Sequence, residues 1–273
     1  MKLQAKFYRA GVYAGTAFSV GVLVMIVGYI LIKGIPHLSP EIFAWEYNST
    51  NVSMTPAIIN TLLMTLISLL VCVPLGIGAA IWLTEYAKRG SKLVKLVRMT
   101  AETLSGIPSI IYGLFGALFF VVALGMGLSL LSGALTLSIM VLPTIMRTTE
   151  EALLAVPDSF REGSFGLGAG RLRTTFKVVL PSAVPGILSG VILAIGRIVG
   201  ETAALIYTAG TVAKVPNGLL DSTRTLAVHM YTISTEGLYI DQSYATAVVL
   251  LVVVLGINAL SSFIAKRIGR SHS

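Results

Sequence analysis

The sequence predicts an all-α membrane protein with six transmembrane helices, and three observations support this fold class. Hydrophobic residues make up 55% of the 273 residues, charged residues only 12%, and the mean hydropathy is +0.86. A soluble domain carries about 25% charged residues, so this chain has too little charge to cover a water-facing surface. The other two observations are the lengths of the uncharged runs and the uneven distribution of the basic residues.

The first two spans follow from the length of the uncharged runs. A helix needs about 20 apolar residues to cross the hydrocarbon layer. The first run lies between Arg9 and Lys33, and it exceeds the apolar core of a signal peptide, which spans about 7–15 residues. We therefore expect an uncleaved first helix. The second run predicts one long span near 56–84.

The remaining runs predict four more spans. The uncharged segment between Glu102 and Arg147 has room for two helices that turn near Gly125–Gly127. A fifth span is expected over about 183–209 and a sixth between Asp241 and Lys266.

The basic residues predict the orientation. Six spans place both termini on one side, and all of the 20 lysines and arginines lie there except Lys33, Lys214, Arg224 and Arg197. Basic loops stay in the cytoplasm, which predicts a multi-pass membrane protein whose termini and 147–182 segment are cytoplasmic. The net charge of +8 is thereby explained without a nucleic-acid partner.

The same reasoning divides the chain into three parts. Residues 1–55 form an N-terminal transmembrane helix and an external loop. Residues 56–265 form a five-helix core with a cytoplasmic loop at 147–182, and residues 266–273 form a cytoplasmic tail.

The cytoplasmic loop contains the glycine-rich, basic segment FREGSFGLGAGRLRTTFKVVLP at 160–181. Its glycines do not form a dinucleotide fingerprint, because Arg171 stands where a glycine would be required. The chain also has no G-K-[ST] sequence, so a P-loop is excluded. We expect no nucleotide site on this chain.

Local signals instead predict a short helix over 157–165. Pro157 suits the first turn of a helix, and Asp158 places negative charge at the positive end of the helix dipole. The glycines that follow permit a sharp turn. A second, basic amphipathic stretch over 171–180 leads back toward the membrane.

This loop resembles the EAA loop of binding-protein-dependent ABC importer permeases. That motif reads E-A-A, three residues, G, nine residues, then I-x-L-P, and the spacing here is the same. The matching residues are Glu162, Gly163, Ser164, Gly168, Val178, Leu180 and Pro181. Gly163, Ser164 and Val178 depart from the motif by small or branched replacements. The resemblance implies a coupling helix that docks into an ATPase subunit; the alternative is an amphipathic connector lying on the lipid surface.

Two further stretches, SGIPSIIYGLFG at 105–116 and GETAALIYTAG at 200–210, resemble phosphate-specific ABC importer permeases, and the second is closer to the PstA type than to the PstC type. The resemblance covers essentially the whole chain, is strongest from about 56 to 264, and implies a bacterial or archaeal cell (inner) membrane. It implies a type I importer permease fold, a PstC-like second permease subunit, two ATPase subunits that bind ATP and Mg, and an external phosphate-binding protein. This chain itself would be no enzyme and would bind no cofactor.

Arg197 and Glu201 are charges inside the fifth predicted span. Arg197 follows Pro181 by 16 residues, about 24 Å along a helix, which is near mid-depth. A charge there is costly and should face a polar interior. Glu201, four residues on, is spaced to pair with it, either as a structural ion pair or as part of an anion pathway in which Arg197 meets phosphate oxygens. The chemistry suits sulfate as well as phosphate.

Other residues give weaker expectations. Arg98 and Glu102 are spaced for an interfacial ion pair. Pro108 with Gly106 and Gly113 predicts a kinked, closely packed helix, and Tyr112 is either an interior hydroxyl of the pathway or a packing residue.

Neither histidine nor cysteine suggests a metal site. The histidines at 37, 229 and 272 lack ligand spacing, and the single Cys72 lies in an apolar run.

The preferred function is therefore an ATP-driven phosphate permease subunit. The alternatives are a permease for another oxyanion such as sulfate, a self-sufficient anion transporter, and a structural or sensing subunit. An intramembrane hydrolase is disfavoured because no Ser/His/acid cluster or Asp pair occurs at spanning positions.

Overall fold

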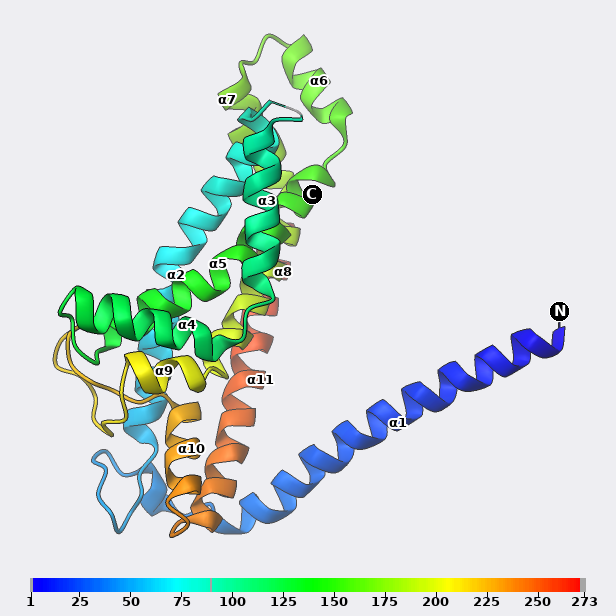
Figure 1. The fold of residues 1–273 in the computed structure, drawn as a ribbon. Helices are drawn as coiled ribbons and strands as arrows, with labels where there is room; N and C mark the ends of the chain where they lie inside the picture. Colours follow the sequence, from blue (N-terminus) through cyan, green and yellow to red (C-terminus); the bar gives the residue numbers. More distant parts are fainter. Residues whose placement is uncertain (1, 89, 271–273) are drawn as a thin grey trace.

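The computed structural model describes residues 2–88 and 90–270, and every regular element in these ranges is helical (Figure 1). The first half contains α1 (Lys2–Gly34), η1 (Ile35–His37), η2 (Pro40–Phe43), α2 (Thr55–Ile81), η3 (Trp82–Tyr86), α3 (Lys92–Ser105), α4 (Ser109–Gly116) and η4 (Ala117–Ala123). The second half contains α5 (Leu130–Leu154), α6 (Asp158–Gly166), α7 (Arg171–Thr174), η5 (Thr175–Val179), α8 (Leu180–Val199), α9 (Ala203–Thr208), α10 (Leu226–Thr235) and α11 (Ile240–Arg270). Of the predicted tail, residues 271–273 lie outside the described ranges.

Among the described residues, five helical stretches are long and apolar enough to cross a membrane: Tyr8–His37, Thr55–Tyr86, Leu130–Leu154, Arg171–Val199 and Ile240–Phe263. A sixth span exists only if α3 and α4 with η4 count as one, because they are bent by 103° at a short break. The all-α membrane fold is thus confirmed, with one span broken. The bundle has two ends, which we call the α6 end, with α6 and α7, and the α10 end, with the turn between α10 and α11 (Figure 1).

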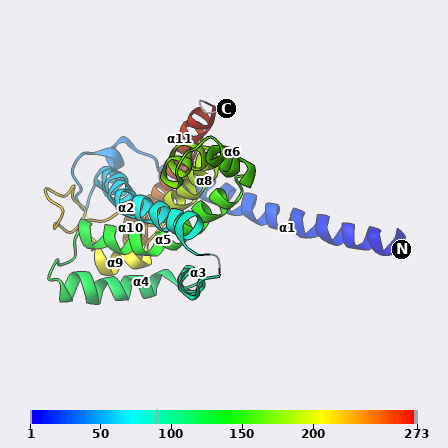
Figure 2. The same cartoon turned by 90° about the horizontal axis from the view of Figure 1, so that it is seen from above.

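Helix α1 leaves the bundle at the α10 end and runs away from the other helices (Figures 1 and 2). Its contacts with the bundle are at its last turns, where Gly34 lies against the backbone of Tyr244 in α11 and Tyr29 packs edge-to-face on the Tyr244 ring. A side chain at position 34 would collide with that backbone. The first predicted span is therefore confirmed as a helix that packs little against its own chain.

Helices α2, α5 and α8 form the core. Small residues let them approach closely, as is usual where lipid gives no hydrophobic driving force between helices. Gly76 of α2 lies against Ile145 of α5, and Gly190 of α8 lies against Thr148 of α5. Buried apolar side chains from these helices, including Met64, Leu137 and Ile198, fill the space between them.

The third predicted span is broken and is not one continuous helix. Helix α3 ends at Ser105, and α4 starts again after Pro108, which precedes its first turn. Proline disfavours a helical residue before it, so the chain breaks there instead of bending slightly. The expected close packing is confirmed, since a methyl at Gly113 would lie 2.7 Å from the Ala204 Cα of α9. Helices α4 and η4 consequently run across the bundle axis (Figure 1).

The turn predicted near Gly125 and Gly127 is confirmed. Both residues have positive φ, +64° and +66°, a conformation that glycine adopts at no steric cost. Ser129 then caps α5 by accepting a hydrogen bond from the Ser132 N–H.

The predicted C-terminal end of the fifth span, at about residue 209, is wrong. Helix α8 stops at Val199, with Gly200 as its C-cap, and α9 begins at Ala203 as a separate short helix. Apart from Arg197 and Glu201 both segments are largely apolar, which is why the sequence predicted one span to 209.

Candidate functional site

Helix α6 stands at one end of the bundle as a short, exposed rod. It spans Asp158–Gly166, within one residue of the expected range, and none of its residues is buried. Pro157 precedes the first turn and Asp158 lies in it, as the local signals predicted. Gly168 provides the turn that follows, with φ +80°. The apolar side chains of Phe160 and Phe165 are about half exposed.

The residues that match the EAA spacing lie on and beside this helix. Glu162 is exposed, and the position beside Gly163 is open, so the alanine of the motif would fit there. Ser164 shares a 2.8 Å hydrogen bond with Thr174 of α7, which is buried. Leu180 and Pro181 form the start of α8, where Leu180 packs on a buried apolar cluster.

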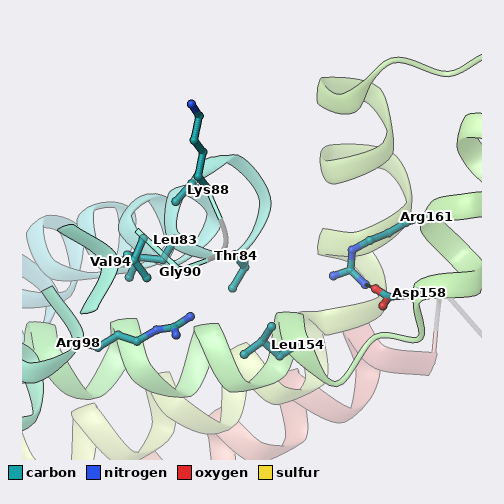
Figure 3. A pocket seen from close by; sticks show the side chains of 10 residues that line it. Leu83, Thr84, Lys88, Gly90, Val94, Arg98, Leu154, Asp158 and Arg161 are labelled. Carbon is teal, nitrogen blue, oxygen red and sulfur yellow. Dashed lines mark hydrogen bonds and ion pairs between the residues drawn. The ribbon is translucent and has the colours of Figure 1, made fainter. Parts of the chain in front are cut away.

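A second set of contacts fixes the base of α6. The guanidinium of Arg161 forms an ion pair with Glu85 of η3, with 2.8 Å between Nη2 and Oε1. Both side chains are largely buried, 15% and 8% exposed. Beside them lies a cavity of about 400 Å³ whose lining includes Lys88, Arg98 and Asp158 (Figure 3).

The expected pair of Arg98 with Glu102 is wrong. Arg98 Nε instead donates to Glu150 Oε1 of α5 at 2.7 Å, and Glu102 is exposed. A buried carboxylate on a facing helix offers a stronger partner than an exposed one four residues along the same helix. The result is a tie between α3 and α5.

Arg197 and Glu201 do not form the predicted pair. Arg197 is in the last turn of α8, whereas Glu201 lies beyond the end of that helix. Glu201 is buried, and its Oε1 accepts a hydrogen bond from the Ala204 N–H in the first turn of α9 at 3.1 Å. Within the described ranges Arg197 has no carboxylate partner.

Tyr112 is buried, and its hydroxyl donates to the Leu104 carbonyl at 2.7 Å. Helices α4 and α9 pack together at Gly113 and Ala204, and the Ala204 N–H is the donor to Glu201. The structure therefore gathers Tyr112 and Glu201 in one region, with Arg197 four residues before Glu201 at the end of α8.

Two polar residues in the interior were missed from the sequence. The Oδ1 of Asn258 in α11 is buried without a hydrogen-bond partner and lies near Gly196, next to Arg197. A lone asparagine in an apolar span is a usable signal of this kind.

Arg224 was expected in an external loop and is instead 4% exposed. Its Nε and Nη2 have no hydrogen-bond partner, and its guanidinium lies 4.5 Å from the centre of the Tyr47 ring. Nothing in the local sequence distinguishes it from an exposed loop arginine.

The histidines are scattered. His37 lies 3.5 Å from Asp241, His229 is fully buried in α10, and His272 is outside the described residues. In the described part of the chain no three potential metal ligands lie together.

Known proteins with similar sequences belong to one family of transport proteins. A profile of the family described as "Binding-protein-dependent transport system inner membrane component" matches residues 72–272. The chain is 35% identical over 240 residues to a probable ABC transporter permease protein, YqgI, of Bacillus subtilis, covering 82% of this chain and 81% of that protein. It is 33% identical over 205 residues to the phosphate transport system permease protein PstA of Mycobacterium leprae, covering 74% and 67%.

A solved structure gives the same fold. A chain of a bacterial alginate ABC transporter, crystallised with its periplasmic protein bound to an alginate pentasaccharide, superposes with a TM-score of 0.69 at 16% identity, covering 98% of this chain and 99% of that one. The predicted importer permease fold is thereby confirmed.

Proposed function

This chain belongs to the family of binding-protein-dependent transport system inner membrane components, and from that premise we propose that it is the phosphate-translocating permease subunit of an ATP-driven importer. The observation that carries the proposal is one of placement. A short exposed helix with the spacing of an importer coupling loop stands at one end of the bundle, and Arg197, partly buried on α8, has no carboxylate partner among the described residues. The phosphate permease from Mycobacterium leprae supports the choice of substrate.

We place the α6 end in the cytoplasm, in line with the distribution of basic residues. There α6 docks into one of two ATPase subunits, which bind ATP and Mg and hydrolyse the nucleotide. Glu162 and the half-exposed Phe160 and Phe165 supply the docking surface. A PstC-like second permease completes the membrane portion, and an external binding protein delivers phosphate at the α10 end.

Phosphate passes beside Arg197. A conduit without positive charge would repel this anion, and an arginine without a carboxylate partner keeps its planar fork free for phosphate oxygens. Tyr112 is a buried polar side chain of α4, and Glu201 caps the first turn of α9, which packs on α4 at Gly113. Glu201 in this proposal shapes the pathway and does not neutralise Arg197.

The test is phosphate uptake into proteoliposomes that contain the complete importer with ATP inside. Replacing one charge-assisted contact with phosphate costs about 1.5–3 kcal/mol, so Arg197→Gln should reduce the apparent affinity for phosphate about ten- to a hundredfold. Arg197→Lys should lose less, because it keeps the charge. Arg173→Gln, an exposed basic residue on α7, is the matched control and should behave as wild type.

Two outcomes would contradict the proposal. If sulfate inhibited phosphate uptake as strongly as unlabelled phosphate does, the proposed substrate would be oxyanions in general and not phosphate. Anion flux through vesicles that contain this chain alone would favour a self-sufficient transporter and remove the need for ATPase partners.

A further inference from the structure

Two neighbouring residues of α6 face in different directions. Glu162, which matches the first position of the importer motif, is exposed, whereas the side chain of Arg161 is only 15% exposed. Successive helix residues are separated by about 100° of rotation, so one can point outward while the other points into the bundle. The outward residue serves a partner, and the inward residue requires its own explanation.

Arg161 uses all three nitrogens of its guanidinium. Nη2 donates to Glu85 at 2.8 Å and to the Leu153 carbonyl at 2.9 Å. Nη1 donates to the Val156 carbonyl at 2.8 Å and to Asp158 at 3.3 Å, and Nε donates to Glu85 at 3.2 Å. One side chain therefore joins α6 to the ends of two membrane helices.

Leu153 lies in the last turn of α5 and Val156 lies two residues beyond its end, and the Leu153 carbonyl also accepts a 3.3 Å bond from the Val156 N–H. The carbonyl groups at the end of a helix have no i+4 partner within the helix and need other donors. A guanidinium satisfies such groups and interacts favourably with the negative end of the helix dipole. Arg161 is thus a cap for α5 as well as a partner for Glu85. Lysine could not reproduce this set of contacts, because an ammonium lacks the planar fork.

Glu85 is placed by an irregularity in α2. The helix widens into the π-helical turn η3 over Trp82–Tyr86, where the Ala87 N–H donates to the Trp82 carbonyl five residues back at 2.8 Å. Such turns change which side chains face inward and are frequent at functional sites. The carboxylate of Glu85 is 8% exposed, so it needs a cationic partner in this position.

The surroundings leave the ion pair as the direct link between α6 and α2. Figure 3 shows Arg161 and Asp158 on one side of the cavity of about 400 Å³, facing Thr84 and Lys88 across it. Close packing elsewhere joins α6 to α7 and η5, including the Ser164–Thr174 hydrogen bond. Between α6 and the end of α2 lies the cavity, so fewer packed side chains are there to transmit a displacement of α6 to α2.

We propose that Arg161 is the positioning residue that passes movement of α6 to α2 and α5, through its ion pair with Glu85 and its bonds to the last carbonyls of α5. The inference rests on the proposed function, because it assigns to α6 the movement imposed by an ATPase subunit. It separates two tasks on one helix: Glu162 contacts the partner, and Arg161 connects the helix to the spans.

The experiment compares variants of the complete importer in proteoliposomes, measuring the phosphate taken up per ATP hydrolysed. Arg161→Lys should leave co-purification of the ATPase subunits and their basal hydrolysis within about twofold of wild type and lower uptake per ATP about tenfold. The reversed pair, Glu85→Arg with Arg161→Glu, should recover less than half of the loss, because a carboxylate at position 161 cannot donate to the α5 carbonyls. Arg173→Lys, an exposed control on α7, should change neither quantity.

The outcomes separate this inference from the proposed function. Wild-type uptake per ATP in Arg161→Lys would overturn the inference. So would a parallel loss of assembly and uptake, since that would reduce Arg161 to a folding residue. Glu162→Lys tests docking itself: normal co-purification and coupling in that variant would overturn the proposed role of α6, whatever Arg161→Lys does.

Discussion

The two ends of the bundle treat buried charge differently. At the α6 end, the buried carboxylates Glu85 and Glu150 are each paired with an arginine from another helix. At the α10 end, Arg224 is 4% exposed and has no carboxylate partner among the described residues. Buried charges at the first end tie helices together, whereas the buried cation at the second is left uncompensated except by an aromatic ring.

The difference has an electrostatic consequence. Ion pairs at the α6 end cancel most of each other's field, so they connect helices without attracting or repelling a passing anion. Arg197 and Arg224 have no carboxylate partner among the described residues, so their charges remain available to a passing anion. The proposed phosphate path uses these unpaired charges and not the ion pairs at the α6 end.

The largest expected effect on stability tests the paired end. Glu85→Gln removes the buried counter-charge of the Arg161 guanidinium and leaves it the exposed Asp158, and breaking a buried pair costs about 3 kcal/mol or more. Unfolding of the purified chain by sodium dodecyl sulfate in mixed micelles measures this loss. Glu151→Gln is the matched control, because Glu151 pairs with Arg147 at the exposed surface and should cost less than about 1 kcal/mol. Equal losses in the two variants would mean that burial does not strengthen the Glu85 pair.

A smaller effect depends on pH at the α10 end. Burial lowers the pKa of His229 from 6.5 to about 3, and the charge of Arg224 adds to the shift. The unfolded chain therefore binds a proton that the folded chain does not, so stability falls as the pH drops from 6.5 toward 3. At pH 5 the loss relative to pH 7 should be about 2 kcal/mol.

The same unfolding assay at pH 7 and pH 5 checks this prediction. His229→Gln removes the titrating group and should remove most of the pH-dependent loss, whereas His37→Gln, an exposed histidine, should leave it unchanged. A slope that persists in His229→Gln would show that another group at this end takes up the proton.

Local sequence signals predicted some features of the two ends and missed the contacts between distant residues. Helix α6 was predicted nearly to the residue, because proline, aspartate and glycine act within one or two turns. The Glu85–Arg161 pair was not, since its members are 76 residues apart and only packing brings them together. Arg98 shows the converse: a favourable four-residue spacing suggested Glu102, and a buried carboxylate on a facing helix is the actual partner.

Breaks within apolar segments were only partly predictable. Gly106 and Pro108 indicated an irregularity, but the 103° angle depends on how α4 packs against α9 at Gly113. After α8 the apolar composition is interrupted only by Gly200, Glu201 and Thr202 before it resumes in α9, so the local sign that the helix ends is short. The break moved Glu201 out of register with Arg197, and this is why the expected ion pair did not form.

The smallest expected effect comes from replacing an arginine by methionine at the α10 end, and the same replacement at the α6 end gives the contrast. Arg224→Met removes an unpaired buried cation, which relieves its desolvation, but also removes the contact with the Tyr47 ring, worth about 0.5–2 kcal/mol. These terms oppose each other, so the unfolding free energy should change by less than about 1 kcal/mol. Arg161→Met should instead destabilise the chain by about 3 kcal/mol or more, because it leaves Glu85 buried and unpaired. If Arg224→Met proved as damaging as Arg161→Met, Arg224 would have a partner of equal strength, and the two ends would handle buried charge alike.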